Sequence, residues 1–457
     1  MLLFLISLLI VSLTAVALIR KFNPQGVLLA AGICMCIIAL VVGGHELEIK
    51  TSSGSVIFNF IKLIEETFLS NISRAGLMIM TIGGYVAFMN HINATHTLVR
   101  ISMKPLAFFR KCPMLAAVLT IPIGQLLFIT TPSATGLGLL LVASVYPILN
   151  SLGVSRLTAL SMIAATTIFD QGPGSANTAL ASELVGENNV EYFITHQLPL
   201  VLPTSCIVML TFYFFNQYFD KKDKRKALSD EPSAVVTPTQ ELAPAYFALF
   251  PVLPLVLLVL LSPYVGLFDN VRINTTMAMF FSLLAVLVIV AVQKRSVRKA
   301  FEAFSAFWKG MGNVFGSVVT LIVASEIFSK GLIQMGFVDS LIAYSTHVGL
   351  TGVLIAILFT VMIFSAAMLM GSGNAAFFSF GPLLPEMAQR LGMPAISLVL
   401  PMQLASSMGR AASPIAGIIV AIAGVVGASP IDLAKRNTLP LIISIASLLV
   451  FHFIVTS

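Results

Sequence analysis

The sequence predicts an all-α polytopic membrane protein made of two inverted-topology repeats, each with about five spans and a re-entrant hairpin. Of its 457 residues, 58% are hydrophobic and only 10% are charged, against about 25% charged residues in an average soluble domain. The apolar residues fall into runs of span length, and two broken apolar regions recur at matching positions. Too few polar residues remain to cover a water-exposed surface, which excludes a soluble enzyme, a disordered scaffold and a nucleic-acid binder.

A helix needs ~20 apolar residues to cross a bilayer. Runs of this kind predict spans at 2–19, 26–43, 74–92, 193–216, 244–266, 274–293, 313–331 and 438–455. The first run is expected to be a retained span, because Arg20 and Lys21 follow it and no small-residue cleavage site does. The amphipathic stretch 56–72 is expected to lie at the membrane surface.

The chain is predicted to contain an internal duplication. Ser133 and Ser372 lie 239 positions apart in similar Gly- and Ser-containing clusters, and the order of spans around them matches. This predicts a first repeat at 1–216 and a second repeat at 244–457. The polar stretch 217–243 is then a linker between them.

The charges of matched loops predict that the repeats are inverted. The counterpart of loop 93–111, at 332–350, has no Lys or Arg. Loop 93–111 itself has four, Arg100, Lys104, Arg110 and Lys111. Because Lys and Arg collect on the cytoplasmic side, matched loops of opposite bias lie on opposite faces. The linker 217–243 is then cytoplasmic, and both termini are periplasmic.

Each repeat contains an apolar region interrupted by Gly, Pro, Ser and Thr. The first predicts a re-entrant hairpin at 112–149 and a broken helix at 157–187, and the second predicts a hairpin at 351–388 and a broken helix at 394–427. Non-helical backbone is tolerated at membrane depth only inside protein or beside a wet cavity. Helix N-termini there favour anions, and freed carbonyls and hydroxyls favour cations. The paired pattern favours a substrate site near the midplane over mere kinks.

The candidate site residues come from the two hairpin tips, at 131–136 and 371–374, from the two breaks, at 170–175 and 409–414, and from the half-helices directly beside the breaks. The residues expected to bind substrate are Ser133, Ala134, Thr135, Ser372, Gly373, Asn374, Ser406, Ser407, Arg410 and Ser413. The residues expected to couple an ion are Thr167, Asp170, Gln171, Ser175 and Asn177.

Two of these residues carry charges at membrane depth, where a charge costs several kcal/mol and so has a function or a fixed partner. Arg410 is the only Lys or Arg in either break, and its planar fork suits a carboxylate. The alternative is an arginine that snorkels or is locked to a structural carboxylate. Asp170 could bind a coupling cation, carry a proton or pair with Arg410.

Two further pairs of opposite charge have i,i+4 spacing, Glu326 with Lys330 and Glu386 with Arg390. Both are predicted to be intrahelical pairs, with a proton relay as the alternative for the first. The histidines show no metal-ligand spacing, so no metal and no cofactor is expected. No enzyme motif and no nucleotide domain occurs, so transport must draw on a substrate gradient or on Na⁺ or H⁺ as the coupling ion.

The residues resemble the DcuC type of anaerobic four-carbon dicarboxylate carrier, over nearly the whole chain. The stretches that carry the likeness are MGSGNAAFFSF at 370–380, PMQLASSMGRAASPIAG at 401–417, SATGLGLLL at 133–141 and FDKKDK at 219–224. The resemblance implies membership of the ion transporter superfamily, with inverted repeats, two re-entrant hairpins and elevator-like movement.

The resemblance also implies a carrier of succinate, fumarate or malate in the bacterial inner membrane, working by exchange or ion coupling. A homodimer in the lipid bilayer is expected. Carboxylate symporters of the superfamily use Ser-Asn-Thr tips, whereas the first tip here reads Ser133-Ala134-Thr135. Asp170-Gln171-Gly172 also departs from the more neutral first break of the main carriers.

The residues alone predict an anion carrier with a hydroxyl-rich site and one arginine. Another carboxylated solute, such as an amino acid, is the main alternative, because its amino group could meet Asp170. A channel or an intramembrane enzyme is a further alternative. Catalysis would need a nucleophile beside a base, and the sequence shows no such pair.

Overall fold

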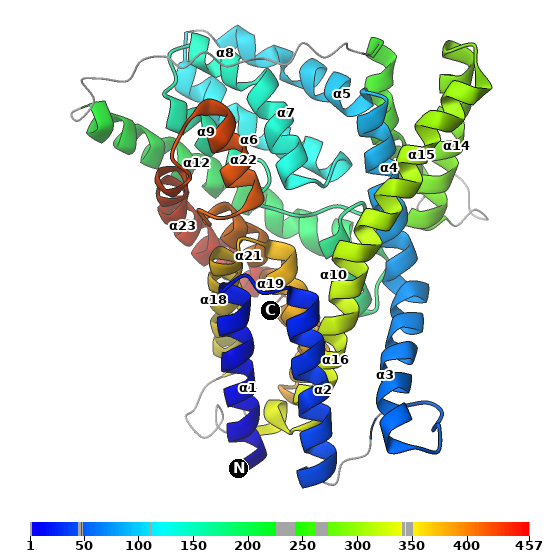
Figure 1. Cartoon of the computed structure of the whole chain (residues 1–457). Coiled ribbons are helices and arrows are strands. Elements are labelled where there is room, and N and C mark those ends of the chain that lie inside the picture. The colour runs from blue at the N-terminus through cyan, green and yellow to red at the C-terminus, as the bar shows by residue number, and fades with distance from the viewer. Residues whose placement is uncertain are drawn as a thin grey trace.

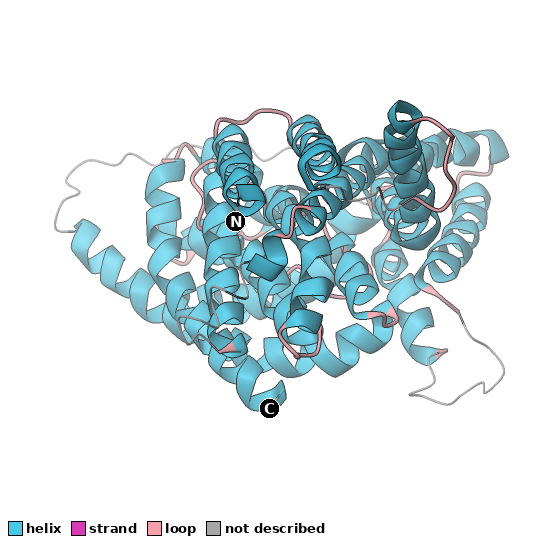
Figure 2. Cartoon of the chain, turned by 90° about the horizontal axis from the view of Figure 1, so that it is seen from below, coloured by secondary structure: helices cyan, strands magenta, loops and turns pink. Residues whose placement is uncertain are grey.

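The structure is a computed structural model that describes residues 2–43, 47, 49–109, 111–224, 243–261, 273–340, 343 and 351–456. Its regular elements are helices joined by short loops, and these ranges contain no strand (Figure 2). The predicted all-α class is therefore confirmed. The predicted linker 217–243 begins too early, because α12 continues to Lys224; residues 225–242 lie outside the described part of the chain.

The helices before the linker are shown in Figure 1. They are α1 (Leu2–Ile19), α2 (Pro24–Gly43), α3 (Val56–Asn71), η1 (Ile72–Gly76), α4 (Leu77–His91), α5 (Ala94–Met103), η2 (Lys104–Phe109), α6 (Pro113–Thr130), α7 (Ala134–Ser144), α8 (Tyr146–Ser151), α9 (Arg156–Ala165), α10 (Ala176–Val185), α11 (Asn189–Tyr192), η3 (Phe193–Gln197) and α12 (Leu198–Lys224). The predicted loop 93–111 is thus largely helical, as α5 and η2.

The helices after the linker follow a similar order. They are η4 (Ala245–Val252), α13 (Leu253–Leu260), α14 (Thr275–Gln293), α15 (Val297–Val314), η5 (Phe315–Val319), α16 (Thr320–Gln334), α18 (Gly352–Met370), α19 (Gly373–Phe380), η6 (Gly381–Leu383), α20 (Leu384–Arg390), α21 (Ile396–Ala411), α22 (Gly417–Val426) and α23 (Pro430–Thr456). The elements η1, η3 and η5 are π-helical turns inside longer helices, and η2, η4 and η6 are 3-10 helices.

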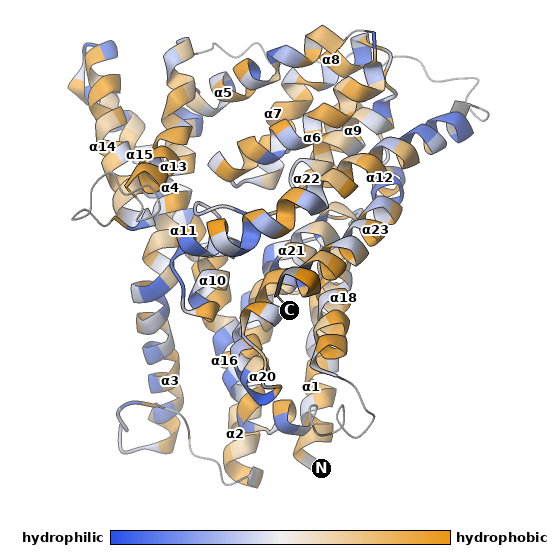
Figure 3. Ribbon diagram, turned by 180° about the vertical axis from the view of Figure 1, so that it is seen from behind, coloured by the Kyte–Doolittle hydropathy of each residue, from blue (hydrophilic) through white to orange (hydrophobic). Residues whose placement is uncertain are grey.

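Nine of the described helices are long and apolar enough to cross a membrane. Figure 3 shows hydrophobic residues along α1, α2 and α18, whereas hydrophilic residues gather on α3 and at the far end of α12. Large apolar side chains stand exposed on these helices, among them Leu13, Val41 and Leu358. Such a surface suits lipid rather than water.

Two composite helices, Val56–His91 and Val297–Gln334, are longer than the spans predicted at 74–92 and 313–331. The stretch 56–72, expected to lie at the membrane surface, is continuous with the span that follows it, because α3 continues through η1 into α4 (Figure 1). Its polar face instead contacts α16: Asn71 donates to Glu326 Oε2 at 2.6 Å, and Lys330 donates to Thr67 Oγ1 at 3.1 Å.

The same two composite helices pack against each other through glycines. A Cβ on Gly310 of α15 would lie 2.8 Å from the carbonyl oxygen of Gly83 in α4, so the backbones approach too closely for a side chain. Around this contact Tyr85, Phe88 and Phe307 form a buried cluster with α14 and η4. These four elements are therefore held together apart from the larger core.

The larger core joins both hairpin regions and both broken helices. It contains buried side chains from α6, α7, α9, α18, α19, α21, α22 and α23. In Figures 1 and 3, α6, α7 and α9 lie toward one end of the molecule, whereas α1, α2 and α18 lie toward the other. The two hairpins thus approach the centre of the molecule from different ends.

Candidate functional site

The first hairpin is formed by α6 and α7, which meet at a short tip. Of the predicted tip 131–136, only residues 131–133 are non-helical; the remainder is the first turn of α7. Ser133 is the N-cap, and its Oγ accepts a hydrogen bond from the Gly136 backbone N–H at 3.3 Å. The serine thus satisfies one of the backbone donors that every helix start leaves unpaired.

The second hairpin, α18 and α19, turns in only two non-helical residues. Gly371 adopts a left-handed conformation with φ of 71°, which ends α18. Ser372 then caps α19, with its Oγ accepting from the Ala375 N–H at 3.2 Å. At each predicted tip the structure thus has a short non-helical turn followed by a helix N-terminus capped by a serine.

The first broken helix is interrupted over a longer stretch than predicted. The half-helix 157–169 was expected, but α9 ends at Ala165, so the break covers 166–175. The physical reason lies in two threonines. The hydroxyls of Thr166 and Thr167 bond back to Ile163 O and Ala164 O, at 2.7 Å and 3.2 Å, and their N–H groups bond to the same carbonyls. These bonds tighten the last turn and compete with the helical ladder.

The second break lies further along the chain than predicted. Gly409, Arg410 and Ala411 belong to α21, so the break covers only 412–416. Gly409 has a packing role instead. A Cβ there would lie 2.3 Å from the Phe364 carbonyl oxygen, so the glycine lets α21 and α18 approach closely. Arg410 consequently projects from the last helical turn rather than from unwound chain.

The first hairpin tip touches both breaks. A Cβ on Gly172 in the first break would lie 2.7 Å from the Ile129 side chain at the end of α6. Directly after the second break, a Cβ on Gly417, the first residue of α22, would lie 3.1 Å from Thr135 Oγ1. The structure therefore brings together the tip of one half and the breaks of both halves.

The second hairpin tip rests on α21. A Cβ on Gly373 would lie 2.7 Å from the Ser406 carbonyl oxygen, and one on Gly371 would lie 3.0 Å from the Ile415 carbonyl oxygen. Gly373 thus contacts the helix that carries Ser406, Ser407 and Arg410. The predicted substrate residues of the second half lie on two elements in direct contact.

Arg410 connects the second broken helix to the first. Its Nη2 donates a hydrogen bond to the Thr167 carbonyl oxygen at 2.6 Å, and its Nη1 lies 3.9 Å from Asp170 Oδ2. The guanidinium carbon also lies 5.8 Å from the centroid of the Phe128 ring, at the end of α6. The carboxylate distance permits Coulomb attraction but is longer than a hydrogen bond. The two charges are therefore neighbours without a close bidentate contact.

Asp170 is held by neutral donors. Its Oδ1 accepts from Ser175 Oγ at 2.5 Å, and its Oδ2 accepts from Asn177 Nδ2 at 3.2 Å. Only 5% of Asp170 is exposed. Ser175 also caps α10, by accepting from the backbone N–H groups of Asn177 and Thr178. One short segment thus builds both a helix start and a carboxylate site.

Several buried polar atoms at these positions have no bonding partner within the described residues. They are Gln171 Oε1, Asn177 Oδ1, Asn374 Oδ1, Ser407 Oγ and Arg410 Nε. Buried polar groups in folded proteins are almost always bonded to protein or water. These five are among fourteen such buried side-chain atoms in the described part of the chain, and each could bond to water, an ion or a substrate.

Other predicted site residues have local roles. Ser406 Oγ donates to the Gln403 carbonyl oxygen at 2.7 Å, and Ser413 Oγ accepts from the Ile415 N–H at 3.3 Å. Ala134 is half-buried and Thr135 is exposed.

The sequence analysis missed a buried network that holds the first break. Gln403 of α21 donates from Nε2 to the Asp170 carbonyl oxygen at 3.2 Å, and Tyr192 OH donates to Gln403 Oε1 at 2.9 Å. Gln197 Oε1 accepts from the Gly172 N–H at 3.0 Å. One signal was available: Gln403 lies seven residues before Arg410, which is two helical turns and hence the same face.

The two predicted intrahelical pairs are confirmed. Lys330 Nζ lies 3.3 Å from Glu326 Oε1, and Arg390 Nε lies 2.9 Å from Glu386 Oε1. The first pair is part of a larger cluster that the sequence did not reveal. Arg74 of η1 lies 3.5 Å from Glu326.

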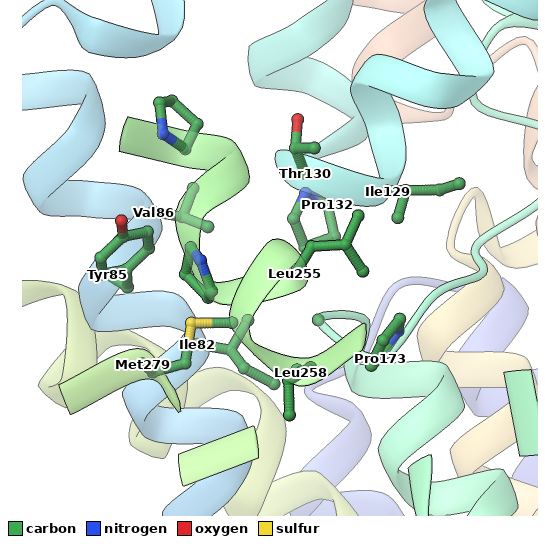
Figure 4. A pocket seen from close by; sticks show the side chains of 13 residues that line it. Ile82, Tyr85, Val86, Ile129, Thr130, Pro132, Pro173, Leu255, Leu258 and Met279 are labelled. Atoms are coloured by element: carbon green, nitrogen blue, oxygen red, sulfur yellow. The ribbon is translucent and has the colours of Figure 1, made fainter. Parts of the chain in front are cut away.

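An apolar pocket lies beside the first hairpin tip, at the edge of α4 and α13 (Figure 4). It is lined by Ile129, Pro132, Pro173, Leu258 and Met279, among others. None of the lining residues carries a charge at neutral pH. The pocket therefore lacks the positive group that a carboxylate needs, and the polar cluster around Arg410 remains the candidate site.

The protein is a polytopic α-helical membrane transporter. This class is defined by its helices of span length, by the two serine-capped tips and by the two interrupted helices around a buried arginine. The chain belongs to the DcuC family of C4-dicarboxylate anaerobic carriers, whose family model matches residues 2–457. The resemblance found in the sequence is thereby confirmed, and the protein is a carrier rather than an enzyme.

Curated relatives extend over almost the whole chain. The anaerobic C4-dicarboxylate transporter DcuC of Escherichia coli strain K12 is 27% identical over 434 residues, covering 95% of this chain and 92% of that protein. A Vibrio cholerae protein named as a probable anaerobic C4-dicarboxylate transporter DcuC is 28% identical over 436 residues, covering 95% of this chain and 93% of that protein.

Two solved structures share the fold. MtrF of Neisseria gonorrhoeae, from a class described as antimetabolite efflux pumps, has a TM-score of 0.67 at 15% identity and covers 94% of this chain and 95% of that chain. The YdaH transporter of Alcanivorax borkumensis has a TM-score of 0.63 at 14% identity and covers 94% of this chain and 98% of that chain.

Proposed function

We propose that this protein is a secondary transporter of C4-dicarboxylates such as succinate, fumarate and malate, located in the bacterial inner membrane. The family and the names of the curated relatives support this substrate class. The single observation that carries the site is Arg410, a buried guanidinium that contacts Thr167 but keeps Nε unpaired within the described residues.

Arg410 supplies the positive charge that a dianion needs in a site of low dielectric constant. Its remaining N–H donors bind one carboxylate of the substrate. The second carboxylate binds near the N-termini of α7 and α19, where backbone N–H groups and the helix dipole favour negative charge. Asn374 and Ser407, each with an unpaired buried oxygen, complete the polar lining.

The first break is the proposed site of ion coupling. Gln171 Oε1 and Asn177 Oδ1 are unpaired acceptors, and both residues are close in sequence to the Asp170 carboxylate. Oxygen acceptors around one carboxylate suit a hard cation such as Na⁺, and the carboxylate itself suits a proton. We propose Na⁺ or H⁺ as the coupling ion. Thr167 and Ser175 lie in the same break and are proposed to belong to the same ion site.

The two halves, 1–216 and 244–457, are proposed to be inverted repeats that move substrate by an elevator-type displacement. The repeated order of hairpin, broken helix and long final helix supports this, as does the approach of the two hairpins from different ends (Figure 1). The linker that follows α12 is then cytoplasmic and both termini are periplasmic. We further propose that the protein works as a homodimer.

A second candidate substrate is another carboxylated solute, such as an amino acid. The observation that favours it is the 3.9 Å separation of Arg410 and Asp170, which leaves the aspartate without a close cationic partner. The amino group of such a substrate would supply one. A channel is a weaker candidate and would give currents far above carrier turnover.

The test is uptake of labelled succinate into proteoliposomes, with unlabelled fumarate, malate and amino acids as competitors and with Na⁺ and H⁺ gradients imposed separately. We expect competition by C4-dicarboxylates and acceleration by one of the two gradients or by internal succinate. Competition by amino acids alone would contradict the dicarboxylate proposal.

A further inference from the structure

A fully buried carboxamide lies near the start of the last long helix in each half of the chain. Gln197 ends η3, directly before α12, and Asn437 lies in the first turns of α23. Neither side chain has exposed surface. Burying an amide among apolar helices is unfavourable unless its hydrogen bonds are made. The partners of each amide therefore indicate what it does.

Gln197 holds the first break. Its Oε1 accepts from the Gly172 backbone N–H at 3.0 Å, and its Nε2 donates to Thr178 Oγ1 at 3.0 Å. Because a backbone N–H can only donate, this contact fixes which amide atom faces the break. The glutamine thus ties the unwound segment after Asp170 to the first turn of α10.

Asn437 holds the end of α21. Its Nδ2 donates to the Ala411 carbonyl oxygen at 3.0 Å, and its Oδ1 accepts from Ser161 Oγ at 2.7 Å. The last carbonyls of a helix have no partner within the helix, so a side chain that binds one of them anchors the helix end. Ala411 directly follows Arg410, and Ser161 belongs to α9. Asn437 therefore ties the second broken helix to the first at the residue next to the arginine.

The two amides occupy matching places. A separation of 240 positions, one more than that between Ser133 and Ser372, relates Gln197 to Asn437, and the same separation relates Gly172 to Ala412. Each amide therefore binds backbone within one residue of equivalent positions in the two breaks. Their polarity is opposite, since Gln197 accepts a hydrogen bond from the backbone and Asn437 donates one.

We propose that Gln197 and Asn437 are equivalent positioning residues, one in each half of the transporter. Asn437 sets the end of α21 so that Arg410 reaches the substrate carboxylate. Gln197 sets the backbone of the first break so that Asp170 keeps its place. The role of Asn437 rests on the proposed function, in which Arg410 binds a carboxylate.

The test of Asn437 is a double-mutant cycle on succinate affinity, measured by calorimetry on the full-length protein. Asn437→Leu lowers the affinity about tenfold or more. In the Arg410→Lys background, where the affinity is reduced but still measurable, Asn437→Leu causes a much smaller loss, because its effect passes through the arginine. Ser444→Ala is the control: it removes a fully buried hydroxyl elsewhere on α23 and leaves the affinity unchanged. Fully additive effects of Asn437→Leu and Arg410→Lys would overturn the proposal.

Hydrogen exchange gives a readout that does not depend on the substrate. Asn437→Leu speeds amide exchange at residues 409–413, and Ser444→Ala does not. Unchanged exchange in Asn437→Leu would overturn the anchoring role. Should Arg410→Ala leave succinate affinity intact, the proposed function would be wrong, and exchange alone would decide whether α21 is anchored. If Asn437→Leu does not fold, Ser161→Ala carries the same predictions, since it removes the second partner of Asn437.

The test of Gln197 uses a conservative rescue. Gln197→Leu removes the acceptor for the Gly172 N–H and abolishes succinate transport. Gln197→Glu restores it when transport is measured at a pH low enough to protonate the carboxyl group, which then offers one acceptor and one donor as the amide does. Thr204→Ala on the following helix, whose hydroxyl bonds only its own turn at 2.7 Å, serves as the matched control and keeps transport. Equal loss in Gln197→Glu and Gln197→Leu would overturn the positioning role.

Discussion

Arg410 donates a hydrogen bond from Nη2 to the backbone carbonyl oxygen of Thr167, with a donor–acceptor distance of 2.6 Å. The two residues are far apart in sequence and belong to the two broken helices. The Thr167 carbonyl has no helical partner because α9 ends at Ala165, and it accepts this bond from Arg410. Arg410 is the only arginine in the two predicted breaks. The hydrogen bond offsets part of the free-energy cost of burying the guanidinium. It also orients the group without neutralising its charge.

The hairpin tips give the first prediction. Asn374→Ala is expected to weaken succinate binding, because Asn374 lies in the first turn of α19 at the second tip and its Nδ2 can donate to a substrate carboxylate. Loss of a hydrogen bond in a charged contact costs about 1.5–3 kcal/mol, or roughly 10- to 150-fold in affinity. Calorimetric titration of the purified protein measures this.

Ser372→Ala serves as the comparison at the same tip. The hydroxyl of Ser372 caps α19, so its loss is expected to cost about 0.5–2 kcal/mol of stability. A drop in melting temperature with Ser372→Ala, and in affinity with Asn374→Ala, separates the two roles. Unchanged affinity in Asn374→Ala would move the carboxylate site away from the second tip.

The second prediction concerns Asp170. Asp170→Asn is expected to keep succinate binding but to uncouple uptake from the imposed Na⁺ or H⁺ gradient, because the neutral amide neither titrates nor balances a cation. Ser175 and Asn177 remain available to hold the side chain. Uptake driven by each gradient in proteoliposomes measures the effect. Gradient-driven uptake at the wild-type level in Asp170→Asn would rule out a coupling role for this residue.

The third prediction concerns the packing of α21. Gly409→Ala is expected to destabilise the fold by about 1–3 kcal/mol, because its Cβ would lie 2.3 Å from the Phe364 carbonyl oxygen. Gly312→Ala is the matched control, since a Cβ there meets nothing within 4 Å. Thermal unfolding in detergent compares the two variants. Equal melting temperatures would show that α18 and α21 do not approach as closely as described.

The fourth prediction concerns topology. If the halves are inverted, cysteines placed at Ser229 in the linker and at Ser102 in loop 93–111 are expected to react with a membrane-impermeant reagent only from the cytoplasm. A cysteine at Thr346 is expected to react only from the outside. Ser229 and Thr346 lie outside the described residues. The labelling therefore tests a membrane topology that is inferred from the charges of the loops. Reaction of all three from one face would contradict the inversion.

The hairpins and breaks were predictable because Gly, Pro and Ser interrupt long apolar runs, and a helix cannot continue unchanged through such clusters. Tip positions agreed closely because Ser133 and Ser372 are N-caps, whose side-chain preference is local. The class of protein and its family followed from composition and from the motifs at these same positions.

The remaining features depend on contacts between distant segments. Gly409 suggested a break, but its role is close packing against α18, which no local pattern reveals. The polar residues of 56–72 suggested a surface helix, whereas Thr67 and Asn71 bond to α16. The contacts of Gln197 and Gln403 with the first break likewise join different segments of the chain, and the sequence analysis did not predict them.

The most direct test of the central claim is the succinate affinity of Arg410 variants. Arg410→Ala is expected to abolish measurable binding and transport, because no other Lys or Arg lies in either predicted break. Arg410→Lys is expected to reduce both sharply, since an ammonium cannot reproduce the planar fork. Calorimetry on the purified variants, with thermal unfolding to verify that each is folded, gives the answer. Loss of succinate binding in folded Arg410→Ala is the predicted result, and wild-type affinity in that variant would contradict the account.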